Sequence, residues 1–198
     1  MSKIKPLTGV NVLVTRPAHQ AKNLADGIYT MGGHSILFPV LEITDVEDAQ
    51  PLLKIIARLN EFDLAIFVSP NAVNKTMHLI QANRTLPPNM KIAVVGKGSA
   101  NALMQFGVTD IIVPTERNDS EALLDQSELQ QIKNKRVVIF RGNGGRKLLG
   151  DILIERGAIL EYAECYYRGK PNIDVTSLLT TWTHDNLNAV TITSSEGL

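Results

Sequence analysis

The stretch VNVLVTR at residues 10–16 decides the fold class, and KRVVIFR at residues 135–141 has the same pattern. Each is a short apolar run, rich in β-branched residues, that ends in an arginine, which is typical of a strand buried on both faces. Matching residues also follow both stretches at a constant offset of 125 positions. Four such matches in the same order predict two related α/β halves. The matched pairs are Arg16 with Arg141, Leu24 with Leu149, Gly32 with Gly157, and Ser69 with Ser194.

Outward from these stretches, apolar runs of strand length alternate with helical patterns along the chain. This order predicts an α/β protein with parallel sheets covered by helices on both sides. Strands are expected at 10–15, 36–43, 64–68, 92–95, 111–113, 137–140, 159–167 and 189–193, and helices near 21–28, 52–59, 72–80, 100–106, 121–132, 148–155 and 178–182.

Composition excludes several classes of protein. The 198 residues include 20 basic and 20 acidic side chains, which argues against a nucleic-acid arm or a membrane-surface segment. A single cysteine, Cys165, excludes an internal disulfide, a cysteine-cluster zinc site and an iron–sulfur site. No apolar run is long enough to span a bilayer, and the start MSKIKPLTG has no apolar signal core, so we expect a cytoplasmic protein.

The repeat also predicts where the second half should end. At the same period it should continue to about residue 261, so we expect this sequence to be truncated at its C-terminus. An unpaired sheet edge and an incomplete core would then cost stability and could leave the 198-residue chain inactive.

Residues that directly follow the predicted strands form the candidate binding edge, because ligands of parallel sheets bind beyond the carboxyl ends of the strands. Hydroxyls, glycines and cations dominate there, and Glu196 is the acidic exception. Glycine-rich turns that open a helix offer free N–H groups to anionic oxygens, and arginine adds bidentate recognition, so an anionic ligand is expected. The segments are Thr15–Pro17, Ser69–Asn71, Gly96–Ser99, Arg141–Arg146 and Thr193–Ser195.

Other interpretations of this edge remain open or fail. Arg16 and Arg141 could simply be surface residues at strand ends. The segment beginning at Gly96 starts like a dinucleotide fingerprint but has Asn101 at the sixth position, and the segment beginning at Gly142 does not match a phosphate-binding loop. No Gly-x-Ser-x-Gly elbow surrounds the serines, and the histidines show no metal-ligand spacing.

Tyr166 ends the long predicted strand 159–167, and two interpretations of it stay open. It could be a core aromatic with its hydroxyl at an interface. Alternatively, its phenol faces the binding cleft as a weak acid or hydrogen-bond donor.

Six motifs, taken in order, resemble the uroporphyrinogen-III synthase family over nearly the whole chain. They are VLVTRP at 12–17, FVSPNAV at 67–73, VVGKGSANAL at 94–103, RGNGGR at 141–146, LIERGAILEYAECYYR at 153–168 and TSSEGL at 193–198.

This resemblance implies a cofactor-free, metal-free hydro-lyase of tetrapyrrole and heme biosynthesis. It would close the linear hydroxymethylbilane, a polycarboxylate, to uroporphyrinogen III with loss of water and inversion of the last ring through a spiro intermediate. It also implies a monomer with two flavodoxin-like or Rossmann-like domains, one discontinuous (1–36 plus 169–198) and one continuous (40–165). A two-stranded connector, strands 36–43 and 159–167, would join them.

Onto this sequence the family pattern places Tyr166 as donor to the departing hydroxyl and Ser99 as a cleft hydroxyl. Its cleft-lining turns match Ser69, Asn71, Thr193, Ser194 and Ser195. Arg16, Lys97 and Arg141 join these substrate-binding candidates from the strand-end argument alone. The alternative function is a non-catalytic two-lobed module that binds an anion or a sugar; a nucleotide-dependent transferase is opposed by the failed fingerprints.

Overall fold

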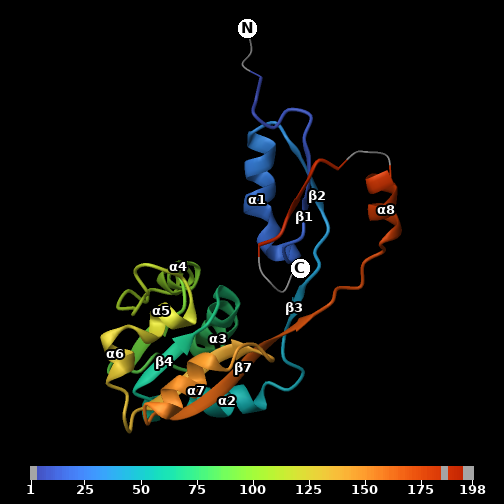
Figure 1. The fold of residues 1–198 in the computed structure, drawn as a ribbon. Helices are drawn as coiled ribbons and strands as arrows, with labels where there is room; N and C mark the ends of the chain where they lie inside the picture. Colours follow the sequence, from blue (N-terminus) through green and yellow to red (C-terminus); the bar gives the residue numbers. More distant parts are fainter. Residues whose placement is uncertain (1–3, 184–186, 194–198) are drawn as a thin grey trace. The chain divides into compact units, whose positions relative to one another are not determined.

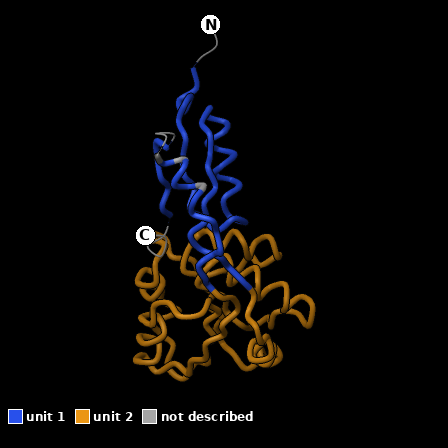
Figure 2. Tube along the Cα trace, turned by 90° about the vertical axis from the view of Figure 1, so that its right-hand side faces the viewer, with its two compact units in different colours: residues 1–44, 168–198 blue, residues 45–167 orange. Residues whose placement is uncertain are grey.

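A computed structural model describes residues 4–183 and 187–193, and the chain divides into two compact units. Unit 1 comprises residues 1–44 and 168–198, and unit 2 comprises residues 45–167 (Figure 2). Each unit is built on parallel strands and is described below by itself.

Unit 1 is built around β1 (Asn11–Val14), which pairs in parallel with β2 (His34–Leu37) and β8 (Ala189–Thr191). Helix α1 (Ala18–Thr30) connects β1 to β2, and α8 (Thr176–Thr183) precedes β8 (Figure 1). Helix α1 packs its buried residues against the apolar side chains of β1. This small core consists of Val12, Val14, Ala21 and Ile28.

The sheet of unit 2 contains four parallel strands in the order β7-β6-β4-β5. Their bounds are β4 (Leu64–Phe67), β5 (Lys91–Val94), β6 (Arg136–Gly142) and β7 (Ile159–Gly169). The short β3 (Glu42–Thr44) belongs to unit 1. The helices are α2 (Gln50–Ala57), the 3-10 turn Leu59–Glu61, α3 (Pro70–Asn83), α4 (Lys97–Gln105), α5 (Ser120–Leu124), α6 (Ser127–Gln130) and α7 (Leu148–Glu155).

Helices cover both faces of this sheet, and successive strand residues point alternately to one face or the other. On one face, side chains of β4 and β6 pack with those of α5, α6 and α7. On the opposite face Phe67 and Phe140 stack with their ring centroids 4.8 Å apart, and α3 packs against β4 and β6 there. We call these the α7 face and the α3 face.

The predicted α/β class with parallel sheets is confirmed, but three predicted elements differ. The stretch 36–43 forms two short strands, β2 and β3, instead of one. Residues 111–113 form no strand, and Ile112 makes an isolated bridge to Ala93. The helix predicted over 121–132 is two helices, because the backbone of Gln126 is extended between them. Within residues 4–183 and 187–193, no helix combines the length and apolarity that crossing a bilayer requires.

Candidate active site

The carboxyl ends of the four parallel strands of unit 2 lie at one edge of the sheet. That edge carries six of the ten residues predicted from the sequence as site residues. They are Ser69 and Asn71 after β4, Lys97 and Ser99 after β5, and Arg141 and Tyr166 at the ends of β6 and β7.

Ser69 links this edge to the start of α3. It is the N-cap residue of the helix, and its Oγ accepts a hydrogen bond from the backbone N–H of Ala72 at 3.1 Å. Pro70 takes the first helical position, where a missing N–H costs nothing, and half-buried Asn71 follows it. The Oγ of Ser69 also lies 3.0 Å from the Oη of Tyr166 and forms a hydrogen bond with it.

Tyr166 is a core residue with its hydroxyl at the strand ends. Only 1% of its surface is exposed. Its ring lies against Gly142, where a Cβ atom would come within 2.5 Å of the tyrosine Cε2, and the N–H of Asn143 donates to its carbonyl oxygen at 3.0 Å. The structure thus has the buried ring of the first sequence interpretation, while its hydroxyl meets Ser69 at the candidate edge.

An irregularity in the sheet explains why Tyr166 reaches Ser69. Arg141 pairs with Glu164, but the next residue, Gly142, pairs with Tyr166, so Cys165 is an extra residue in β7. Side chains that pair in a sheet share a face, and one inserted residue reverses the alternation beyond it. This β-bulge turns Tyr166 to the face of Gly142.

The start of α4 adds a second helix N-terminus to the edge. A Cβ on Gly98 would lie 3.4 Å from the Cγ of Pro70, so the first turns of α3 and α4 are neighbours. Lys97 is exposed, and its N–H donates to Asn118 Oδ1 at 3.0 Å. Ser99 is only 2% exposed. Two adjacent helix N-termini and a lysine create a positive potential that favours anions.

Arg141 lies apart from Tyr166. Its guanidinium carbon is 5.0 Å from the centroid of the Tyr162 ring, and its Nε donates to the carbonyl oxygen of Gly142 at 3.3 Å. A Cβ on Gly145 would lie 2.8 Å from the same guanidinium. Because Arg141 precedes Gly142 in β6, its side chain points to the α7 face, opposite Tyr166.

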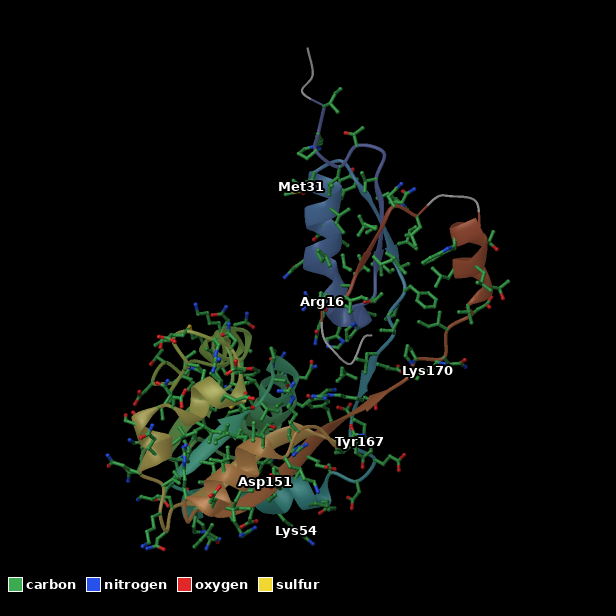
Figure 3. All side chains as sticks on the ribbon, viewed as in Figure 1. Arg16, Met31, Lys54, Asp151, Tyr167 and Lys170 are labelled. Atoms are coloured by element: carbon green, nitrogen blue, oxygen red, sulfur yellow. The ribbon has the colours of Figure 1, made fainter. Side chains whose placement is uncertain are left out.

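The remaining predicted residues belong to unit 1. Arg16 follows β1 near the start of α1 (Figure 3). Its Nε is buried and has no hydrogen-bond partner in the part of the chain that the structure describes. Thr193 follows β8 and is exposed. Ser194 and Ser195 lie outside the described residues.

Sequence reasoning missed the role of Gly142 and the bulge at Cys165. The sequence predicts an anion-binding turn for the glycines of residues 141–146, and it does not predict that Gly142 provides the space for the Tyr166 ring. The Cys165 thiol donates to the carbonyl oxygen of Arg141 at 3.1 Å, and burial raises its pKa to about 11, so it is a neutral packing group at pH 7. Across the described ranges, no three His, Cys, Asp or Glu side chains are grouped in a way that could hold a metal ion.

Comparison with known proteins identifies the family. The family model for uroporphyrinogen-III synthase HemD matches residues 22–198. The uroporphyrinogen-III synthase of Escherichia coli K12 is 35% identical over 190 residues, which are 96% of this chain and 77% of that protein. The enzyme of the same name from Proteus mirabilis is 34% identical over 160 residues, 80% of each chain.

Solved structures agree on the fold. A crystal structure of a mutant uroporphyrinogen III synthase from the extremely thermophilic bacterium Thermus thermophilus matches with a TM-score of 0.67 at 17% sequence identity, over 95% of this chain and 74% of that one. From the matching family model and these relatives we conclude that the chain belongs to the uroporphyrinogen-III synthase family.

Proposed function

We propose that this chain is a uroporphyrinogen-III synthase that closes hydroxymethylbilane to uroporphyrinogen III, with loss of water and inversion of the last ring through a spiro intermediate. The observation that supports it best is the hydrogen-bonded pair of Ser69 and Tyr166 at an edge that also carries two helix N-termini. This edge offers a hydroxyl donor beside groups that attract carboxylates.

Binding of the polycarboxylate substrate would use several moderate contacts. The starts of α3 and α4 point their N-terminal ends to the same edge of unit 2, and the exposed Lys97 adds a cation. Each contact with a carboxylate is a charge-assisted hydrogen bond or an attraction to a helix dipole. The proposed substrate-binding residues are Ser69, Asn71, Lys97, Ser99, Arg141, Arg16, Thr193, Ser194 and Ser195.

The chemical step requires a weak acid and a constrained substrate. An electron-rich hydroxymethylpyrrole loses its hydroxyl readily. Tyr166 would donate its proton to the departing oxygen, which leaves as water, and the tyrosinate would take back the proton that the last ring loses on ring closure. Direct closure of the free ends gives the type I isomer. The protein must therefore hold the chain so that the substituted carbon of the last ring is attacked first, and orientation would supply most of this selectivity. We propose that the enzyme works as a cytoplasmic monomer and without a cofactor.

Product analysis tests the proposal. Freshly generated hydroxymethylbilane is added to the chain, and the product is oxidised and separated into its isomers. Type III product formed faster than uncatalysed closure is the expected result, with unchanged activity in the presence of a metal chelator. Type I product alone, at the uncatalysed rate, would contradict the synthase assignment, and calorimetric binding of the bilane without turnover would favour the non-catalytic alternative.

A further inference from the structure

We propose that Ser69 is a positioning residue that acts through Tyr166. The bulge at Cys165 and the space above Gly142 place the tyrosine ring, and Ser69 holds its hydroxyl in position. This deepens the proposed function and rests on it. It replaces the direct substrate binding that the family pattern implies for Ser69 with a positioning role, and the test below distinguishes the two roles.

The bulge selects the face on which Tyr166 lies. Tyr162 and Tyr166 are four residues apart in β7, so in a regular strand both would point to the α7 face. The shift between the pairs of Arg141 and Gly142 reverses the orientation of Tyr166, which lies beyond it, and leaves Tyr162, which precedes it, unchanged. Cys165, the extra residue of the bulge, also points to the α3 face, and its thiol lies 4.0 Å from the carbonyl oxygen of Ala72.

Gly142 then sets the depth of the ring. The ring of Tyr166 occupies the space that a side chain of residue 142 would fill, since an ideal Cβ there would be 2.5 Å from Cε2 and 2.7 Å from Cζ. Real Cβ atoms do not approach other carbons so closely, so a larger residue would push the ring outward. The aromatic ring is therefore held between β6 and its own strand, with the hydroxyl directed across β6 toward the end of β4.

Ser69 holds the hydroxyl oxygen of Tyr166 in position. Its own Oγ is held by the N–H of Ala72 in the first turn of α3, so the serine has little freedom to rotate away. Through the 3.0 Å bond, the start of α3 thus determines where the Tyr166 oxygen lies. A donor placed within a fraction of an ångström affects the rate of the chemical step much more than the binding of the substrate.

The test compares variants that separate this role from helix capping and from substrate binding. Ser69→Ala removes the contact, and Ser69→Thr keeps a hydroxyl and a capping oxygen. Gln81→Gly is the matched control because residue 81 is exposed near the far end of α3. Glycine there destabilises the same helix and leaves Tyr166 untouched. Each change is made in the wild-type chain and in Tyr166→Phe.

We expect Ser69→Ala to lower kcat about tenfold, the worth of one hydrogen bond, with KM changed less than about twofold. In the Tyr166→Phe background, the same change should have almost no further effect, since no tyrosine hydroxyl is left to position. Ser69→Thr should restore most of the rate, and Gln81→Gly should leave kcat unchanged. A rise in KM at constant kcat, or an equal loss of kcat in the Tyr166→Phe background, would overturn the positioning role.

A readout that needs no activity separates this proposal from the synthase assignment. With tyrosine labelled at 13Cζ, the Tyr166 resonance should shift in Ser69→Ala and stay in place in Gln81→Gly. An unmoved resonance in Ser69→Ala would overturn the contact itself, even in a fully active enzyme. A wild-type chain that makes no type III product would contradict the proposed function while this resonance still reports the contact.

Discussion

Unit 1 and unit 2 pair their central strands in the same register. In unit 1, Val12 of β1 pairs with Ala189 of β8. In unit 2, Val137 of β6 pairs with Leu64 of β4. Val137 lies 125 positions after Val12, and Ala189 lies 125 positions after Leu64. The repeat in the sequence therefore corresponds to a repeated parallel ladder.

The two units also share a hydrogen bond from the backbone to a side chain at the start of their central strands, β1 and β6. The N–H of Asn11 donates to Asn188 Oδ1 at 2.7 Å, and the N–H of Arg136, its counterpart, donates to Asp63 Oδ2 at 2.9 Å. Asn188 and Asp63 are also 125 positions apart. The amide of unit 1 is thus replaced by a carboxylate in unit 2, where it also binds Lys135 at 2.9 Å.

The carboxyl ends of the strands differ far more. In unit 2 the bulge at Cys165 brings Tyr166 to Ser69, whereas position 41, the counterpart of Tyr166, is a leucine. Arg141 packs on Tyr162, but Arg16 has a buried Nε without a partner among the described residues. A shared local pattern therefore fixes the ladder, and tertiary neighbours decide the chemistry at its edge.

The largest effect is expected from removing the hydroxyl of Tyr166, whose counterpart in unit 1 is Leu41. We expect Tyr166→Phe to slow closure about a hundredfold, the lower range for a positioned acid, with the fold retained because the ring stays. Tyr162→Phe is the control, since it lies in the same strand on the other face and keeps its ring contact with Arg141. Steady-state turnover of hydroxymethylbilane measures both, and unchanged turnover in Tyr166→Phe would remove Tyr166 from the mechanism.

A second test uses the glycines that end the matching helices. Gly32 and Gly157 have φ values of +89° and +87°, so alanine at either position should destabilise its unit by about 1–2 kcal/mol. The loss should be larger for Gly32→Ala, whose Cβ would meet the Lys5 Cβ at 2.8 Å, than for Gly157→Ala, whose Cβ would meet the Lys133 Cγ at 3.2 Å. Urea unfolding measures the stability of both variants. A loss of stability in only one of them would show that the two glycines do not have equivalent roles in the two units.

The two arginines give a smaller effect. Arg16→Ala should raise KM about tenfold with little change in kcat, because its guanidinium lies just after β1, where it would pair with a substrate carboxylate. Arg141→Ala should raise KM less, because its side chain is already engaged with Tyr162 and its own backbone. Equal effects on KM would show that local contacts do not distinguish the two strand ends.

The smallest effect should come from making the strand start of unit 2 like that of unit 1. The hydrogen bond from Lys135, then that from the N–H of Arg136, lowers the pKa of Asp63. A lowered pKa adds stability above the ordinary carboxyl pKa, and this stability is lost as the pH falls through the folded value. Asp63→Asn should therefore cost a few tenths of a kcal/mol at neutral pH and almost nothing near pH 2, since the pair is largely exposed. Urea titrations at both pH values measure this, and a pH-independent loss would contradict it.

Local patterns were enough to predict much of the molecule. β-branched runs predicted the strands of both ladders, and the helix predicted over 148–155 matches α7. The predicted strand 36–43 failed because Phe38 to Leu41 lie between β2 and β3, and the predicted helix 121–132 failed at Gln126. Such breaks depend on contacts made elsewhere in the chain and leave the apolar pattern unchanged.

The sequence by itself determined the α/β class, the repeat and the set of residues at the strand ends, because these depend on periodicity and on residues close along the chain. Tertiary structure alone decided that Tyr166 turns to the face of Ser69, that Arg141 turns away, and that Ser99 is buried. The physical reason is that one extra residue in a strand reverses every side chain beyond it. Only the pairing with β6 shows where that residue lies.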